Sequence, residues 1–157
     1  VPATAGITKA VMADTIVVPY NDADALERAL KNNDIAAFIV EPVLENIGIC
    51  LPQPGYLEAV RRITREHGTM LIFDEVKTGI TAGWGGATGV LGVQPDLVCL
   101  AKSIGGGLPI GAFGILGVFC TLVHTTETHL SWQQQKLFLA KCARRLLRKQ
   151  QSLAMHC

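Results

Sequence analysis

A carboxylate and an amine, each placed just after an apolar run, are the chemically most suggestive residues of this sequence. Asp74 follows the run 70–73, and Lys102 follows the run 97–100 shortly before a glycine triplet. A carboxylate can keep a heterocyclic nitrogen protonated, and a lysine amine can form a Schiff base with an aldehyde. Pyridoxal phosphate (PLP) chemistry needs both of these groups from the protein, so the pair indicates that chemistry.

The elements that must position this pair are predicted by alternating apolar runs and helical patterns up to about residue 114. The continuous apolar runs are typical of parallel strands buried on both faces, and we expect the first of them to be a central strand. Strand, helix and strand in repetition predict an α/β fold with right-handed crossovers. Ligands bind at the carboxyl ends of such strands, so Glu41, Asp74 and Lys102 are expected to converge. The predicted buried strands cover 35–40, 70–73 and 97–100.

One further strand and two helices are predicted from local patterns. The β-branched run 15–18 predicts a short strand. Asn21 or Asp22 is expected to cap a helix that has a regular apolar face. Pro54 suits the first turn of a second helix, which we expect to reach about His67.

Composition favours a globular chain and does not support nucleic acid or a membrane as a partner. The 157 residues can bury a core, and hydrophobic residues make up 49% against 17% charged residues. A formal net charge of +1 gives no reason to expect nucleic acid. The uncharged stretch 103–126 is broken by glycines and Pro109, and its unbroken part, 110–123, is shorter than the ~20 residues of a spanning helix. We therefore interpret it as a buried strand with its loops and expect no membrane segment.

Cysteine usage and the N-terminus bear on the compartment. The five cysteines are scattered and lack a CxxC spacing, so neither a disulfide framework nor a zinc site is predicted. The first residues carry no basic-then-apolar signal pattern. We expect a cytoplasmic protein, with an organelle as the open alternative.

The character of the sequence changes near residue 115. A helix is predicted over 130–147, and no acidic residue follows Glu127. Such a basic amphipathic segment is typical of a solvated face or of a surface that binds anions, and a segment never selected to fold is the third interpretation. We therefore divide the chain into 1–114 and a divergent tail, 115–157.

The segment 1–114 resembles class III PLP-dependent aminotransferases, and within them glutamate-1-semialdehyde 2,1-aminomutase. The resemblance implies a partial PLP-binding large domain, that is, part of a three-layer α/β sandwich with a mostly parallel sheet of the fold type I transferases. It also implies an amino donor or amino aldehyde as substrate, and a homodimer in the complete parent. The motifs that carry it are Glu41-Pro42-Val43, Pro52-Gln53-Pro54-Gly55-Tyr56-Leu57, Leu71-Ile72-Phe73-Asp74-Glu75-Val76, Gly85-Gly86-Ala87, Pro95-Asp96-Leu97 and Lys102 with Gly105-Gly106-Gly107-Leu108-Pro109-Ile110-Gly111-Ala112.

Four residues receive roles from this resemblance. Lys102 would form the Schiff base with PLP and move the proton, and Asp74 would pair with the pyridine nitrogen. Val76 would pack on the cofactor ring, and Asn46 would lie near its phenolic oxygen. Taken singly, each has a plainer interpretation: a solvated lysine, a helix-capping carboxylate, a core valine and a turn asparagine. Glu75 is assigned no separate chemistry.

The sequence also departs from the family pattern. Leu44-Glu45 stand where small residues are common, and 79–84 lacks an arginine that members often carry. The family's phosphate-binding turn and stacking aromatic residue lie upstream of the matched segment, and its small domain lies downstream. Because the resemblance stops at Gly114, a shifted frame or misjoined exon is a hypothesis that sequencing the transcript would test.

Three functions therefore stay open. The first is a fragment of a PLP-dependent aminotransferase or aminomutase that uses Lys102 and is inactive alone. The second is a non-catalytic protein that pairs with a full-length family member. The third, a nucleotide-binding domain, is disfavoured because the glycine loop follows Lys102 and lacks the spacing of a phosphate loop.

Overall fold

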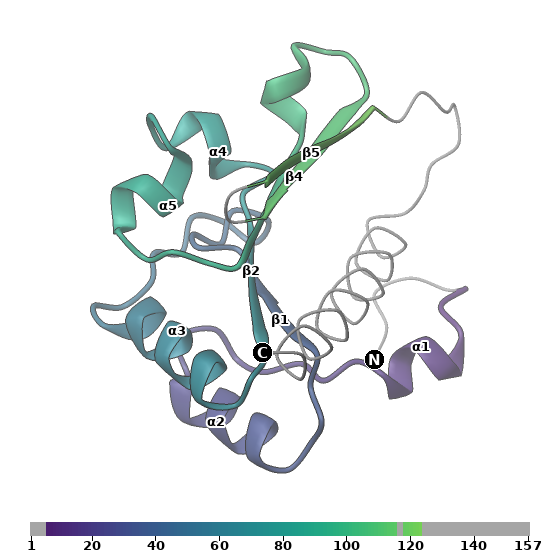
Figure 1. The fold of residues 1–157 in the computed structure, drawn as a ribbon, viewed down its shortest axis with the longest axis vertical. Helices are drawn as coiled ribbons and strands as arrows, with labels where there is room; N and C mark the ends of the chain where they lie inside the picture. The colour runs from purple at the N-terminus through teal and green to yellow at the C-terminus, as the bar shows by residue number, and fades with distance from the viewer. Residues whose placement is uncertain (1–5, 116–117, 124–157) are drawn as a thin grey trace, which may run out of the picture.

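The computed structural model describes residues 6–115 and 118–123, in which helices alternate with the strands of one sheet (Figure 1). The strands are β1 (Ala37–Val40), β2 (Met70–Asp74), β3 (Leu97–Leu100), β4 (Ile110–Ile115) and β5 (Val118–Val123). The helices are α1 (Lys9–Ala13), α2 (Ala23–Lys31), α3 (Tyr56–Glu66), α4 (Thr78–Thr81), α5 (Gly86–Leu91) and a 3₁₀ helix over Lys102–Gly105.

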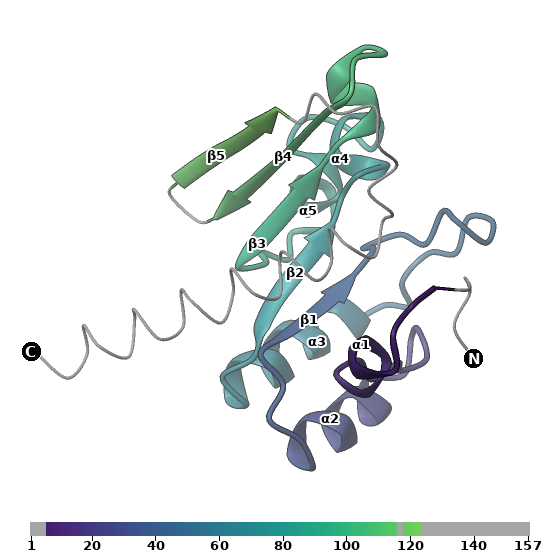
Figure 2. The same cartoon turned by 90° about the vertical axis from the view of Figure 1, so that its right-hand side faces the viewer.

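The sheet has the order β1-β2-β3-β4-β5 and is mixed. β1, β2 and β3 are parallel, whereas β4 pairs antiparallel with β3 and β5 pairs antiparallel with β4 (Figure 2). The predicted α/β class is confirmed, and its parallel part contains the three strands that lead to Glu41, Asp74 and Lys102. The expected central position of the first strand is wrong within the described residues, because β1 lies at the sheet edge. Residues 37–39 are accordingly only half-buried.

One face of the sheet is covered by α2, α3, α4 and α5, whereas α1 lies on the other side (Figure 1). Strand alternation sends Leu71 and Phe73 of β2 toward this helical layer, where both are fully buried with Val60 of α3. Ile72 points to the opposite face and packs in a second cluster with Leu97 of β3. The two clusters hold β2 from both sides, which fixes the register of the strand that ends at Asp74.

The helix boundaries follow the local capping chemistry. The Asp22 carboxylate caps α2 by accepting a hydrogen bond from the Ala25 amide at 2.8 Å, which confirms one of the two predicted caps. Asn21 instead accepts a hydrogen bond from the Gln53 amide at 2.9 Å and so ties α2 to the segment before α3. α3 ends just before His67, as the sequence predicts.

Two sequence predictions need correction in this part of the chain. Residues 15–18 form no strand; they lie outside the sheet, and the Val17 side chain is 88% exposed. β-Branched residues favour a strand only where another strand is available to pair with them. The stretch 103–126 contains two paired strands, β4 and β5, in place of one buried strand. The helix predicted over 130–147 lies outside the described residues.

Candidate functional site

The chain places two consecutive carboxylates on opposite sides of the sheet. Successive residues of a strand point to opposite faces, so Asp74 lies on the face of Ile72, and Glu75 lies on the helical face with Phe73. Both residues are buried, with exposed fractions of 5% and 2%. The neighbours of each carboxylate therefore decide what it does.

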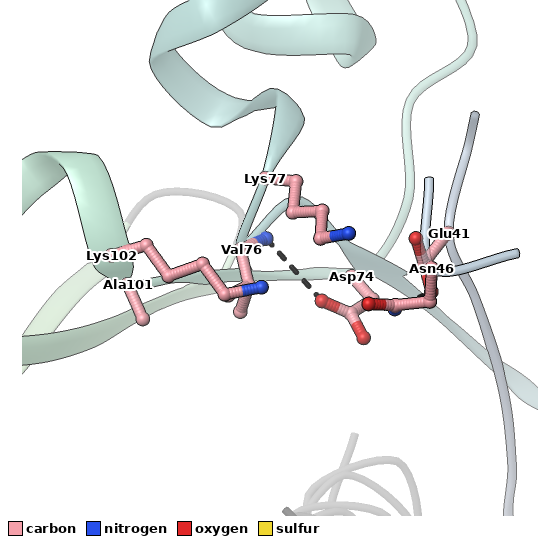
Figure 3. A pocket seen from close by; sticks show the side chains of 7 residues that line it. All are labelled: Glu41, Asn46, Asp74, Val76, Lys77, Ala101 and Lys102. Atoms are coloured by element: carbon pink, nitrogen blue, oxygen red, sulfur yellow. Dashed lines mark hydrogen bonds between the residues drawn. The ribbon is translucent and has the colours of Figure 1, made fainter. Parts of the chain in front are cut away.

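Asp74 and Lys102 line the same cavity, which has a volume of about 310 Å³ (Figure 3). The two side chains enter it from different strand ends and point toward one another, as Figure 3 shows. The Asp74 carboxylate accepts a hydrogen bond from the Val76 amide at 3.3 Å. The cavity is lined by Glu41, Asn46, Asp74, Val76, Lys77, Ala101 and Lys102. The structure thus brings together all four residues that the sequence singled out, together with Glu41 at the end of β1.

Lys102 occupies an unusual backbone conformation. Its φ is +52°, in the left-handed region, immediately after an extended Ala101. For a residue with a side chain this conformation costs roughly 1–2 kcal/mol relative to the ordinary helical region. Strain of this kind persists where the surrounding structure imposes it and is frequent at functional sites. Here it turns the chain sharply between β3 and the 3₁₀ helix, at the residue whose amine enters the cavity.

Glu41 organises the loop that carries Asn46. Its carboxylate accepts hydrogen bonds from the Asn46 side-chain amide at 2.6 Å and from the Glu45 backbone amide at 3.1 Å. The loop is closed by paired backbone bonds between Leu44 and Cys50. Glu41 therefore positions Asn46 at the cavity, a contribution that the motif Glu41-Pro42-Val43 did not reveal.

The Glu75 carboxylate is used to hold α5. It accepts hydrogen bonds from the backbone amides of Ala87 at 2.5 Å and Thr88 at 2.9 Å, and from the hydroxyls of Thr78 and Thr88. A carboxylate that accepts N–H groups at a helix N-terminus stabilises the helix. The plain interpretation of a capping carboxylate thus applies to Glu75, and the helix concerned is α5.

A second cavity of about 450 Å³ shares Val76, Lys77 and Lys102 with the first, so the two are contiguous. Its remaining lining residues are Glu45, Ile49, Thr81, Ala82 and Ser103. Sequence reasoning missed Lys77, although it directly follows the Asp74-Glu75-Val76 motif. The Lys77 ammonium donates a hydrogen bond to the Glu45 carbonyl oxygen at 2.8 Å and so ties the Asn46 loop to the start of α4.

Cys99 lies beside Asp74 in the register of β2 and β3. Burial, together with the negative charge of Asp74, raises the pKa of the Cys99 thiol to about 12. The thiol is therefore neutral at physiological pH. This contact supplies Asp74 with an uncharged neighbour in the sheet.

Two negative findings concern the described residues, 6–115 and 118–123. No group of His, Cys, Asp and Glu side chains there is arranged to hold a metal ion. No helix in this part is long and apolar enough to cross a bilayer.

The fold resembles that of part of solved fold type I PLP enzymes. An omega-transaminase from Sphaerobacter thermophilus matches with a TM-score of 0.68 and 40% identity, covering 73% of this chain and 26% of that one. A glutamate-1-semialdehyde-aminomutase variant from Pseudomonas aeruginosa PAO1, in complex with PMP, matches with a TM-score of 0.62 and 40% identity. That match covers 64% of this chain and 22% of the other. The chain thus has part of the fold of a PLP-dependent transferase.

The family is given by the sequence comparisons. The family model for class III aminotransferases matches residues 1–129, so the chain belongs to the class III aminotransferases. The chain is 56% identical over 115 residues to glutamate-1-semialdehyde 2,1-aminomutase of Roseiflexus castenholzii. That alignment covers 72% of this chain and 26% of the relative, so the chain spans about a quarter of that relative's length.

Proposed function

We propose that this chain supplies the lysine and ring-nitrogen side of a PLP site in a class III aminotransferase or aminomutase. The observation that carries the proposal is the convergence of Asp74 and Lys102 on one cavity. The cavity volume of about 310 Å³ lies at the lower end of the range for small-molecule sites. A buried carboxylate opposite a strained lysine fits the ring and aldehyde of PLP.

The four residues that the sequence singled out, and Glu41, then have defined tasks. Lys102 would provide the amine that attaches the cofactor, and the same amine would carry the proton between the substrate α-carbon and the cofactor. Asp74 holds a proton on the pyridine nitrogen, helped by its burial next to the neutral Cys99 thiol. Val76 covers the ring, and Asn46, oriented by Glu41, donates toward the phenolic oxygen. When bound, PLP supplies an aldehyde that condenses with amines and a ring that accepts electrons.

The two cavities offer fewer groups that could bind the phosphate of PLP than groups that could bind its ring. The only cations lining the two cavities are Lys77 and Lys102, within the part of the chain that the structure describes. Phosphate binding usually rests on helix N-termini and several charge-assisted hydrogen bonds. We therefore expect the chain alone to bind PLP weakly and to catalyse no transamination, with the amino donor and a homodimeric assembly belonging to the complete parent.

Titration with PLP tests the proposal. Purified chain should change the absorption spectrum of PLP saturably, because Lys102 attaches the cofactor. The Lys102→Ala variant should abolish the change, whereas Lys9→Ala, which removes an exposed lysine of α1, should leave it intact. Equal loss in both variants, or no saturable change in folded wild-type chain, would refute the proposal.

Exposed apolar residues on α4, on α5 and in the turn between these helices favour a second candidate, a protein that pairs with a full-length family member. Ile80 of α4 is 54% exposed, Trp84 in the turn is 103% exposed, and Val90 of α5 is 62% exposed. Large exposed apolar residues are frequent at protein interfaces. Co-expression with a full-length class III aminotransferase should then give a complex that Trp84→Ser weakens. Failure of wild-type chain to co-purify would remove this candidate.

A further inference from the structure

Lys77 combines three properties that its backbone hydrogen bond does not explain. It is half-buried, it lines both cavities, and it forms no ion pair with any described residue. Its one hydrogen bond, to the Glu45 carbonyl oxygen, uses a single N–H. A lysine ammonium has three such donors, so two remain for a ligand.

The position of Lys77 suits a ligand that bridges the two cavities. Val76 and Lys77 form the turn between β2 and α4, and in Figure 3 the Lys77 side chain extends over the Asp74 carboxylate toward Asn46. Three carboxylates line the same cavities, those of Glu41, Asp74 and Glu45. Lys77 nevertheless forms no ion pair with a described residue, and half-burial leaves its positive charge less well solvated than at the surface. An anion placed beside Lys77 would therefore gain from both its charge and its free N–H groups.

The second cavity shows what kind of anion fits. Apart from the two lysines, it offers the hydroxyls of Thr81 and Ser103 and the apolar side chains of Ile49 and Ala82. A short aliphatic chain that ends in a carboxylate matches this lining. Glu45 also lines the cavity, and its negative charge would oppose a second carboxylate on the same ligand.

We propose that Lys77 binds the carboxylate of a monocarboxylic amino-group donor or acceptor. The inference rests on the proposed function, since it assigns Lys102 to the cofactor and leaves Lys77 as the remaining cation of the two cavities in the described chain. Lys77 is a binding residue in this account, and it takes no part in proton transfer. It would fill the role of an anchor in a chain whose residues 79–84 contain no arginine.

The test needs no cofactor and follows the lysines directly. Chain with ¹³C-labelled lysine gives NMR signals for the Cε–Hε groups, and Lys77→Met assigns the Lys77 signal by its loss. Butyrate, butylamine and inorganic phosphate are added in separate titrations. Butyrate carries the proposed carboxylate, butylamine has the same chain without it, and phosphate represents the oxyanion of the cofactor.

We expect butyrate to shift the Lys77 signal saturably while the Lys9 signal stays in place, and butylamine to shift neither. The butyrate concentration at half-saturation can be measured on the signal of Lys102, the other lysine of the cavities. It should rise about fivefold or more in Lys77→Met and change little in Lys77→Arg. Equal shifts of Lys9 and Lys77 would overturn the proposal. Saturation by phosphate at a lower concentration than by butyrate would also overturn it, because Lys77 would then serve the cofactor phosphate.

The result is separable from that of the proposed function. Attachment of PLP to Lys102 is read from the absorption titration of wild-type chain, which follows a different lysine and uses no butyrate. If Lys102 attaches PLP but butyrate does not shift the Lys77 signal, only this inference fails. If butyrate binds at Lys77 but PLP does not attach at Lys102, the proposed function fails and the carboxylate site remains.

Discussion

Asp74 and Glu75 are adjacent in the sequence, but their different surroundings give their carboxylates different tasks. On the helical face, Glu75 accepts hydrogen bonds from four donors and fixes α5. On the opposite face, Asp74 borders the cavity that Lys102 also enters. The comparison teaches that a motif of two acids need not supply two catalytic groups. One face of the strand end is committed to structure, and the other borders the candidate site.

The largest expected effect follows from removing the Glu75 carboxylate. Glu75→Ala leaves the buried Ala87 amide, the part-buried Thr88 amide and two hydroxyls without their acceptor, so the free energy of unfolding should fall by about 3–5 kcal/mol. Asp74→Asn keeps the shape of the side chain and an acceptor oxygen for the Val76 amide, so it should cost less than Glu75→Ala. Urea denaturation measures both variants. An equal loss in the two would contradict the division of tasks.

Substitution of Gly86 tests how tightly Glu75 is packed against α5 on the helical face. Its φ is +64°, and a Cβ there would overlap Glu75 Oε2 and lie 3.1 Å from Gly79 Cα. Gly86→Ala should therefore lower the free energy of unfolding by about 3 kcal/mol, from strain and overlap together. Gly92→Ala is the matched control, because Gly92 has a φ of +70° with open space around it. Its cost should be only about 1 kcal/mol; equal melting shifts would exclude crowding at Gly86.

On the cavity side, we expect a smaller difference in stability between two substitutions of Lys102. Because its φ is +52°, glycine should fit this position better than alanine. We expect Lys102→Gly to be more stable than Lys102→Ala by about 1 kcal/mol, although both lose the amine. Thermal unfolding of the two variants compares them directly. An alanine variant as stable as the glycine variant would show that the backbone relaxes once the lysine is gone.

At neutral pH the ionisation of Cys99 has the smallest expected effect, because it is seen only at alkaline pH. Burial and the charge of Asp74 raise the pKa of its thiol above the ordinary value of 9.0 to about 12, so the folded state disfavours the thiolate. The stability contributed by the neutral thiol is fully present below pH 9 and is lost as pH rises toward 12. Cys99→Ala should therefore lose stability less steeply than wild type over this range in urea denaturation. Parallel pH profiles would contradict the assignment.

Much of this organisation could be predicted from the sequence, because it rests on local chemistry. The cap at Asp22, the end of α3 and the strands before Asp74 and Lys102 follow from capping residues and apolar runs. The failure at 15–18 has a non-local cause, since strand formation depends on a pairing partner that propensity does not reveal. Most hydrogen bonds of Glu75 likewise depend on α5, whose residues Ala87 and Thr88 lie twelve and thirteen positions along the chain.

The candidate site shows the same limit. The sequence motifs indicated Asp74 and Lys102, and parallel strands explain why they meet. The convergence of Glu41 with them is likewise expected from its strand end, but its hydrogen bond to Asn46 is not. Lys77 gained its importance only through its contact with the loop that carries Asn46. Charged residues near a motif are usually solvated, so residue type alone could not separate Lys77 from a surface group.

The most direct test of the central claim is to trap PLP on the purified chain with borohydride and locate the added mass by peptide mapping. The account predicts that the modification concentrates at Lys102, well above Lys77, Lys9 and the other lysines. It also predicts that Asp74→Asn lowers the yield at Lys102 while the chain stays folded. Labelling spread evenly over the lysines of a folded chain would contradict the claim that Asp74 and Lys102 form a cofactor pocket here.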